Sequence, residues 1–277
     1  AAIGAEVSPT NRHIQYNIAT GRWRELASLP EVRHHLQLVV CQEVLYALGG
    51  FGINASGQWV MQDQSWSYDA EADTWHKATA APEVHAESVA TVMGDSAIHI
   101  VGGRTPSAQR NASWLDHGDS VRHLIYHVGS QEWSQAAPPL HSRNSAAGAN
   151  INGQLYVVGG RTVSGGNVSY LEVYDVREER WRMAAPLPQA QGGLAAAAIN
   201  GQLLAFGGEF FGAEDYGVYS NTWCYNPGRD QWDAMAPMRT PRHGLGAVSD
   251  GEFVYAVGGA TDVATRGTCA VLEAFSF

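Results

Sequence analysis

The sequence has no run of eighteen or more apolar residues, so it contains no candidate for a membrane-spanning helix. It also has few charged residues, 16% of the total, and their balance gives a formal net charge of -10. A chain with this acidic balance lacks the basic surface that a nucleic-acid backbone requires. We therefore expect a soluble monomer with neither a membrane nor a nucleic acid as partner. The cytoplasm, the periplasm and secretion are all compatible with this composition.

Cysteine is scarce, and Cys41, Cys224 and Cys269 are too few and too far apart for a disulfide framework. No Cys-x-x-Cys pair indicates zinc, and we expect reduced thiols on buried strands. The sequence also lacks a Gly-x-Ser-x-Gly elbow, a His-Glu-x-x-His motif and a phosphate-binding loop. No motif therefore points to a serine hydrolase, a zinc peptidase or a nucleotide-binding enzyme, and we expect no cofactor.

Glycine, in contrast, is abundant, and it recurs in pairs that end apolar runs. The pairs belong to an internal repeat that also contains a tryptophan column and, seven residues before each tryptophan, a tyrosine column. The glycine pairs begin at Gly49, Gly102, Gly159, Gly207 and Gly258. The tryptophans are Trp23, Trp75, Trp133, Trp181 and Trp232, and the tyrosines are Tyr16, Tyr68, Tyr126, Tyr174 and Tyr225. The distance from a tryptophan to the next glycine pair is nearly constant, at 26 or 27 residues. The variable loops therefore lie between each glycine pair and the tryptophan that follows it.

Each repeat unit has the pattern of four short β-strands. In the clearest unit we expect strands over residues 145–151, 155–160, 170–175 and 180–184. Alternating apolar residues and β-branched or aromatic side chains favour strands there, and Asn152-Gly153 predicts a tight hairpin turn. The tyrosines and tryptophans are large enough to supply most of the packing between neighbouring sheets.

Four-stranded units with a glycine pair in the second strand and Tyr-x6-Trp across the third and fourth strands resemble the Kelch repeat. This resemblance covers essentially the whole chain. It implies an all-β fold, a Kelch β-propeller in which each unit forms one blade, with residues 1–277 as a single domain.

The number of blades depends on how the two ends of the sequence are counted. Residues 3–6 (IGAE) have the pattern of a degenerate glycine pair, and Phe275 stands in the tyrosine column. The favoured count is six blades of four antiparallel strands, of which the first and last are incomplete. A segment preceding Ala1 would then supply the two missing strands, since exchange of strands between the ends protects the sheet edge. The alternative is a ring of five blades closed by the strand at Trp23, with residues 1–20 outside it.

The variable loops and the segments that lead into the first strands lie at the same end of an up-and-down blade, so we expect a shared mouth there. The residues leading into the first strands are Arg33, His85, Arg143, Gln191 and Arg242. The residues after the glycine pairs are Phe51, Arg104, Arg161, Glu209 and Ala260. Arginines around one opening would attract anions, and the planar guanidinium suits carboxylates. The predicted ligand-binding residues are Arg33, His34, His85, Arg104, Arg143, Arg161 and Arg242.

A structural role is an equally good interpretation for Arg33, Arg143 and Arg242, because Kelch repeats commonly carry arginine at this position to bond loop carbonyls. The variable loops carry Trp59 and Trp114, whose aromatic faces would suit a sugar or an extended peptide.

Glu209 and His243 are the candidate catalytic residues if the protein is an enzyme. A carboxylate beside a histidine can exchange protons near neutral pH. The same pair could instead form an ion pair that stiffens the mouth. His34, His35 and His85 could join them in a metal site, but no complete ligand motif is present, and we predict no metal.

Two functions remain as hypotheses. The favoured one is a binding module that recognises an acidic peptide or a carboxylate-bearing small molecule at the mouth. The alternative is an enzyme that acts on an acidic sugar by acid-base chemistry, because "GQLLAFGGE" and "PRHGLGAV" resemble the repeat style of the bacterial Kelch N-acetylneuraminate epimerases. That resemblance includes no catalytic motif, and a fold this widely shared does not specify function.

Overall fold

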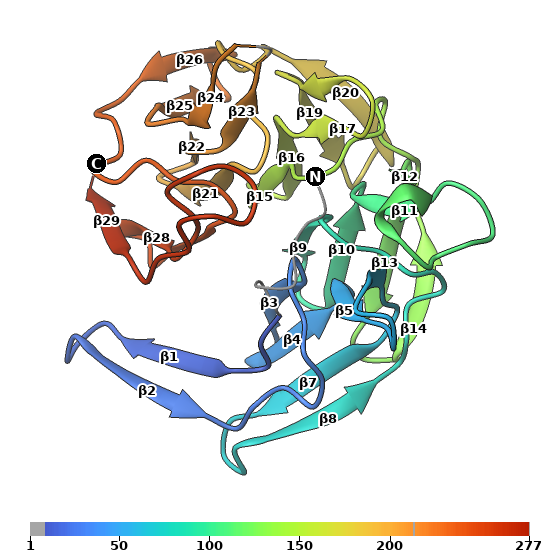
Figure 1. Ribbon diagram of the computed structural model, residues 1–277. Helices are drawn as coiled ribbons and strands as arrows, with labels where there is room; N and C mark the ends of the chain where they lie inside the picture. Colours follow the sequence, from blue (N-terminus) through green and yellow to red (C-terminus); the bar gives the residue numbers. More distant parts are fainter. Residues whose placement is uncertain (1–8, 213, 277) are drawn as a thin grey trace.

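The computed structural model describes residues 9–212 and 214–276, which form a β-propeller of antiparallel sheets. Five sheets, blades I to V, are arranged around a central axis (Figure 1). Blade I contains β3 (Gln37–Cys41), β4 (Val44–Leu48), β7 (Ser65–Asp69) and β8 (Thr74–Ala78), and blade II contains β9 (Val89–Met93), β10 (Ala97–Val101), β13 (His123–His127) and β14 (Glu132–Gln135). Blade III contains β15 (Ala147–Ile151), β16 (Gln154–Val158), β19 (Leu171–Asp175) and β20 (Arg180–Ala184), and blade IV contains β21 (Ala195–Ile199), β22 (Gln202–Phe206), β25 (Thr222–Asn226) and β26 (Gln231–Ala234). Blade V has three strands, β27 (Gly246–Ser249), β28 (Phe253–Val257) and β29 (Leu272–Ser276).

Short hairpins leave blades I to IV between their second and third strands, where the sequence predicted the variable loops. They are β5 (Phe51–Ile53) with β6 (Trp59–Met61), β11 (Arg104–Pro106) with β12 (His117–Asp119), β17 (Arg161–Thr162) with β18 (Gly166–Asn167), and β23 (Glu209–Phe211) with β24 (Tyr216–Val218). A short 3-10 helix, η1 (Trp114–Asp116), lies between β11 and β12. The structure describes no helix long and apolar enough to cross a membrane in these residue ranges.

The described residues form five blades, which agrees with the alternative prediction and not with the favoured count of six. Their inner strands are neighbours in the order β3, β9, β15, β21 and β27, and Figure 1 shows an opening between blades V and I. A separate hairpin of β1 (His13–Asn17) and β2 (Arg22–Leu26) lies beside blade I, where the His13 ring contacts Tyr68 and Trp75. The favoured count of six required a strand at residues 3–6, which lie outside the described residues.

The closure expected for the five-bladed alternative was wrong. The strand at Trp23 was expected to complete the last blade, but β2 pairs with β1 and not with β29. The physical reason is the local pairing of the two strands, in which Tyr16 lies opposite Trp23 and the two rings are 4.9 Å apart. This pairing holds β2 in its own hairpin.

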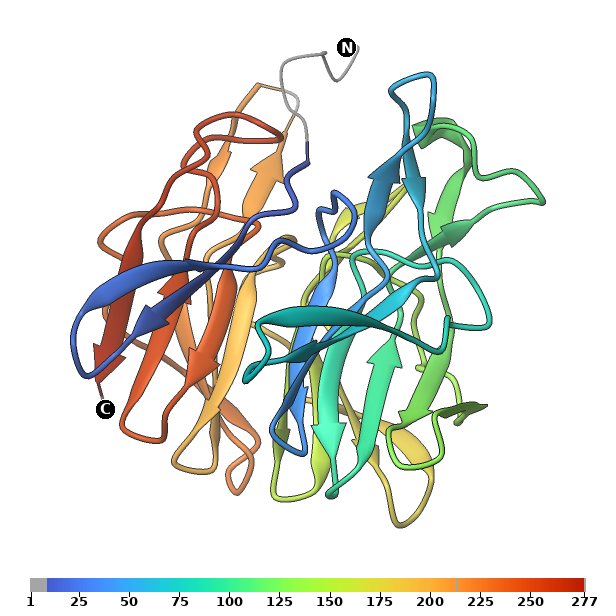
Figure 2. The same ribbon diagram turned by 90° about the horizontal axis from the view of Figure 1, so that it is seen from below.

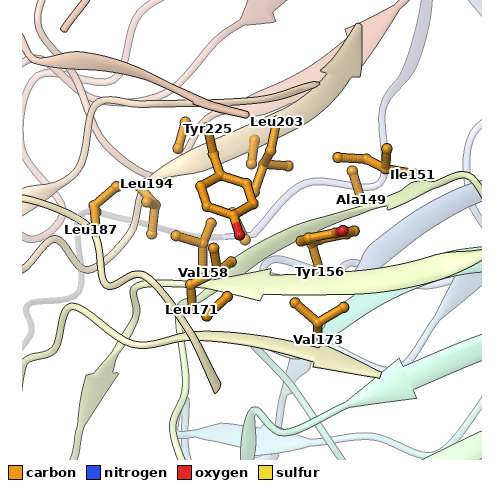
Figure 3. Close-up of a cluster of buried hydrophobic side chains, with 14 residues drawn as sticks. Ala149, Ile151, Tyr156, Val158, Leu171, Val173, Leu187, Leu194, Leu203 and Tyr225 are labelled. Carbon is orange, nitrogen blue, oxygen red and sulfur yellow. The ribbon is translucent and has the colours of Figure 1, made fainter. Parts of the chain in front are cut away.

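The tyrosine and tryptophan columns face each other across the third and fourth strands of blades I to IV, as the repeat predicted. Each tryptophan also reaches back to the preceding segment of the ring, where its indole Nε1–H donates to a backbone carbonyl. The pairs are Trp75 with Ala27 at 3.0 Å, Trp133 with Thr79 at 3.1 Å, Trp181 with Ala137 at 2.8 Å and Trp232 with Ala185 at 2.8 Å. Figure 3 shows the buried core between blades III and IV, where the rings of Tyr156 and Tyr225 lie 6.0 Å apart, tilted by 53°, among aliphatic side chains.

A belt of backbone hydrogen bonds joins the blades at the mouth. The amides of Glu87, Ser145, Gly193 and Gly244 each donate to the carbonyl of the equivalent residue in the preceding blade, beginning at His35, over 2.9–3.2 Å. All five belt residues have left-handed backbone conformations, with φ between 51° and 71°. The second glycine of each pair lies directly beneath this belt. A Cβ on Gly103 would lie 2.5 Å from the carbonyl oxygen of Ala86, so this position requires glycine.

The arginines that lead into the first strands hold the blades together internally. Arg242 has 0% of its surface exposed, and its guanidinium donates to the carbonyls of Thr240, Ala256 and Gly258 and to the Glu273 carboxylate. Arg143 likewise donates to the carbonyls of His141 and Val157 and pairs with the fully buried Glu172 at 3.1 Å. Each arginine thereby satisfies several buried carbonyls at once.

We expect Arg143→Met to lower the free energy of unfolding by roughly 3–5 kcal/mol, because it leaves the Glu172 carboxylate buried without its cation. Arg143→Met combined with Glu172→Gln should recover part of that loss, since the amide carries no charge. Urea unfolding of the two variants measures the difference. A single variant as stable as the wild type would show that this pair does not stabilise the blade.

Two histidines are buried together between blades II and III. His99 Nδ1 lies 2.8 Å from His123 Nε2, and His123 Nδ1 lies 3.1 Å from the carbonyl oxygen of Ala137. Because that carbonyl only accepts, His123 donates from Nδ1, and its Nε2 accepts a hydrogen bond from the Nδ1–H of His99. Burial lowers the pKa of His99 to about 3 and that of His123 to about 4. Both rings are therefore neutral at physiological pH.

This pair predicts a loss of stability in mild acid. Above pH 6.5 neither the folded nor the unfolded chain protonates these rings, so they impose no cost. Between pH 6.5 and about 4 only the unfolded chain takes up the protons, which favours unfolding; for His123 alone the effect reaches roughly 3 kcal/mol. His99→Leu/His123→Leu should therefore flatten the dependence of unfolding free energy on pH in this range. The exposed His76→Gln is the control, and an unchanged slope in the double variant would contradict the prediction.

Candidate functional site

A cavity of about 700 Å³ lies on the axis of the ring, between its inner strands. Its walls are mostly small or aliphatic residues from β3, β9, β15, β21 and β27, among them Ala90, Gly148 and Ala196. Much of its polar lining comes from the belt residues, their chain neighbours and one hairpin: His34, His35, Glu87, Ser145, Arg161 and His243. Figure 2 shows the hairpin β5–β6 projecting from the ring. The sequence predicted this clustering of loops and strand-leading segments at one mouth.

Arg161, Glu209 and His243 form one polar cluster at the mouth. Arg161 follows the glycine pair of blade III, and its Nη1 donates to Glu209 Oε1 over 2.6 Å. The second carboxylate oxygen of Glu209 accepts the amide N–H of Ala264 at 2.8 Å, which fixes its orientation. His243 Nδ1 lies 3.4 Å from Glu209 Oε1, and its Nε2 lies 3.0 Å from the Asp262 carbonyl oxygen. Burial lowers the pKa of His243, although the nearby Glu209 opposes that shift.

Glu87 and Arg104 form a second cluster on the neighbouring side of the cavity. Arg104 Nε donates to Glu87 Oε2 over 3.0 Å, and Ser145 Oγ donates to the same oxygen over 2.5 Å. Burial alone would raise the pKa of Glu87, but the electrostatic influence of Arg104, His35 and Arg161, together with the hydrogen bond from Ser145, outweighs it and lowers the pKa to about 2. Glu87 is therefore ionised. Each of the two mouth arginines consequently has its own carboxylate, so the mouth carries less positive charge than the arginine columns predicted.

An aromatic cluster extends the mouth over blades I and II. Phe51 is stacked between His34 and His117, each with ring centroids 5.1 Å away. Trp59 contacts His34 at 4.0 Å, and Trp114 contacts His117 at 4.7 Å. The two tryptophans predicted from the variable loops are thus brought together, with centroids 6.0 Å apart.

Hydrogen bonds fix the two loops that carry this aromatic cluster. Asn111 pairs with both backbone groups of Met61, and Asn54 donates to the carbonyl of Ala112. Arg104 connects the cluster to the Glu87 side of the cavity, because its guanidinium lies 4.2 Å from the centre of the Trp114 ring. The aromatic surface is therefore preorganised beside the charged lining.

Five of the seven predicted ligand-binding residues do not line the cavity. Arg33, Arg143 and Arg242 are buried and donate to carbonyl groups close to them in sequence or within their own blade, a placement that favours their structural interpretation. His85 is buried against Gly49, whose hypothetical Cβ would lie 2.5 Å from its ring. His34 and Arg161 do line the cavity, and Arg104 reaches it through Glu87.

Sequence reasoning missed Glu87 and Ser145 as mouth residues. Both occupy the belt position, two residues after the leading arginine or its equivalent, where the backbone is left-handed. The sequence signal for this position is the set of residues two places after each leading residue, namely His35, Glu87, Ser145, Gly193 and Gly244. Two of these five residues are glycine, which favours a left-handed backbone at this column.

The proposed convergence of histidines with Glu209 does not produce a metal site within the described ranges. No group of three or more His, Cys, Asp or Glu side chains there has a metal-binding arrangement. His34 and His35 contact each other, with their Nδ1 atoms 2.6 Å apart, whereas His85 points into the blade interface.

Comparison with known proteins places these features in a family. The family model of the KLHDC2/KLHL20/DRC7 Kelch-repeats domain matches residues 88–273. Kelch-like protein terF of Aspergillus terreus is 33% identical over 167 residues, which cover 60% of this chain and 36% of that protein. Kelch-like protein 23 of Mus musculus is 26% identical over 159 residues, covering 57% of this chain and 25% of that protein. The matched region thus spans about a third or less of the length of these relatives.

The fold is also similar to that in the solved structure of YjhT. The two chains superpose with a TM-score of 0.81 at 16% identity, over 98% of this chain and 96% of the other. At this identity the likeness establishes the architecture alone. Together with the repeat columns and the family match, it shows that the chain belongs to the Kelch-repeat family, whose β-propellers serve as interaction modules.

Proposed function

We propose that the mouth of this propeller binds an anionic ligand, either an acidic peptide or a carboxylate-bearing small molecule. The observation that carries the proposal is that most hydrogen-bond donors of the Arg161 guanidinium have no partner in the described residues. Arg161 lines the cavity with 19% of its side chain exposed, yet in the described part of the chain its Nη1 alone is hydrogen bonded, and its buried Nε has no partner. Arg242, by contrast, uses Nε, Nη1 and Nη2 within its blade.

A guanidinium with unused donors, held in place by Glu209, is suited to a second carboxylate. An incoming carboxylate could accept two parallel hydrogen bonds from it, the geometry in which arginine and carboxylate bind most strongly. Ser145 and the imidazoles of His35 and His243 line the same cavity and can supply further hydrogen bonds. The aromatic surface of Trp59 and Trp114 would pack against the apolar part of the ligand.

Arg161→Gln should weaken binding of an acidic ligand by about tenfold or more, which corresponds to loss of a charge-assisted hydrogen bond. The measurement is isothermal titration with a glutamate-rich hexapeptide and with N-acetylneuraminate as probes. Arg229→Gln is the control, since Arg229 is exposed and lies in the turn between β25 and β26, at the opposite end of the blade. The proposal is overturned if neither probe binds the wild type, or if Arg161→Gln binds as tightly.

A second candidate function, acid-base chemistry on an acidic sugar, is favoured by the Glu209–His243 contact. The Asp262 carbonyl accepts a hydrogen bond, so His243 carries its proton on Nε2. Nδ1 then presents a lone pair to Glu209 Oε1 at 3.4 Å, unless one of the two groups holds an additional proton. Such a pair can take up or release one proton next to a ligand held by Arg161.

This alternative predicts that the protein accelerates interconversion of the anomers of N-acetylneuraminate, which exchange spectroscopy by NMR measures. Glu209→Gln should reduce that rate by roughly a hundredfold or more while leaving the fold intact. A wild-type rate equal to that of the uncatalysed reaction removes the enzymatic alternative and leaves the binding proposal in place.

A further inference from the structure

The charges at the mouth balance one another, although the protein as a whole is acidic. Arg104 pairs with Glu87 at 3.0 Å, and Arg161 pairs with Glu209 at 2.6 Å. Burial lowers the pKa of each histidine that lines the cavity, so these rings add no positive charge at neutral pH. A purely anionic ligand would disturb this balance among buried charges, whereas a ligand that carries one charge of each sign would preserve it.

Glu87 has an acceptor that the protein leaves unused. Arg104 and Ser145 both donate to Oε2, at 3.0 and 2.5 Å, and within residues 9–212 and 214–276 no group donates to Oε1. The Glu87 side chain is only 3% exposed, and the residue lines the cavity. A buried carboxylate normally has hydrogen-bond partners on both oxygens. An open oxygen beside a cavity therefore indicates a donor on the ligand.

Ser145 places a second acceptor beside Glu87. A hydroxyl group has one proton, and Ser145 Oγ lies closer to Glu87 Oε2, at 2.5 Å, than to Asn144 Oδ1, at 3.0 Å. The proton therefore points to Glu87, and the lone pairs of Ser145 Oγ can accept hydrogen bonds. An ammonium group has three N–H donors, so it can bind both of these acceptors at once.

Arg161 is a neighbour of these two acceptors. Its backbone pairs with that of Asn144, the residue before Ser145, through two hydrogen bonds of 2.9 Å. Burial raises the pKa of Glu87, but nearby positive charges, that of Arg161 among them, lower it to about 2. In the part of the chain that the structure describes, Arg161 forms its ion pair with Glu209 and none with Glu87. A short ligand can therefore lie between the free donors of Arg161 and the free oxygen of Glu87.

The walls of the cavity below the mouth cannot hold a charged group. The side chains that line them are mostly small or aliphatic, among them Val89, Ala147 and Leu194. An unpaired charge in such surroundings loses its hydration without gaining a partner. Both charged groups of a ligand must therefore lie at the mouth, and its apolar atoms can lie against the walls.

We propose that the ligand of the mouth is a small zwitterion, an amino acid whose carboxylate binds Arg161 and whose ammonium group binds Glu87 and Ser145. The inference rests on the proposed function, because Arg161 holds the carboxylate in both. It adds a requirement for a positive charge on the same ligand. The ammonium group donates to Glu87 Oε1 and Ser145 Oγ, and the carbon chain of the ligand spans the distance from there to the Arg161 guanidinium.

The test compares the unbranched amino acids from glycine to 6-aminohexanoate with matched alkanoates, from propionate to heptanoate. In each alkanoate a methyl group replaces the ammonium group. Isothermal titration should show that the best amino acid binds about tenfold more tightly than its alkanoate, or better, because only the amino acid forms charge-assisted hydrogen bonds with Glu87. The chain length of that amino acid measures the spacing of the two sites. The inference is wrong if no amino acid binds more tightly than its alkanoate.

Glu87→Gln should remove this preference. The glutamine oxygen can still accept from Arg104 and Ser145, but the side chain has no charge for an ammonium group. Binding of the amino acid should weaken by about tenfold, whereas binding of the alkanoate should stay the same or become tighter. Glu178→Gln is the matched control, since Glu178 is exposed in the turn between β19 and β20, at the opposite end of blade III. An equal loss of both ligands would contradict the role of Glu87, because a general disturbance of the mouth would explain it.

Arg161→Gln separates this inference from the function on which it rests. The variant should weaken the binding of amino acids and alkanoates alike, because both place their carboxylate on Arg161. If alkanoates bind through Arg161 and amino acids bind no better, the mouth is a site for simple anions and only the zwitterion is ruled out. If neither class of ligand binds the wild type, both proposals are wrong.

Discussion

The belt of backbone hydrogen bonds at the mouth is the constraint on which both the ring and the candidate site depend. Each bond joins a left-handed residue of one blade to its equivalent in the preceding blade, from His35 to Gly244. A left-handed conformation costs energy for residues other than glycine, and His35, Glu87 and Ser145 adopt it nonetheless. The belt compensates for this cost by satisfying an amide and a carbonyl at each joint. The same conformation allows the side chains of these three residues to line the cavity.

The distribution of charge follows from this geometry. Arginines at the leading positions have backbone carbonyls of their own blade within reach. Their guanidinium groups donate to these carbonyls, as in Arg143 and Arg242. Arginines after the glycine pairs lie above the belt, where Glu87 and Glu209 pair with them. The two sets look alike in the sequence, but only the second contributes to the mouth. Arg161 differs from Arg104 in that it lines the cavity and retains an unpaired Nε.

Most of the fold was predictable because the repeat supplies its own alignment. The spacing of Tyr174 and Trp181 placed them opposite each other, and the strands of blade III begin and end within two residues of their predicted bounds. The candidate site was predictable only in part. The pairing of His243 with Glu209 followed from their columns, whereas the inward orientation of Glu87 was signalled only by the glycines of its column, and that of Arg33 depends on its contacts with Val32 and Gln64. The closure of the ring was also beyond the pattern, because it depends on whether β2 pairs with β1 or with β29.

The open joint between blades V and I has a direct consequence for the cavity. His34 and His35 belong to the first wall and His243 to the last, and within the described residues no belt bond joins Gly244 to His35. Within the described residues the belt therefore connects these two walls through blades II to IV. The Arg161–Glu209 pair and the Glu209–Ala264 bond tie blade III to blade V at the mouth and span part of the distance between the walls. Glu209 therefore does more than neutralise Arg161: it fixes the position of the loop that follows the last glycine pair, and hence the width of the opening next to His243.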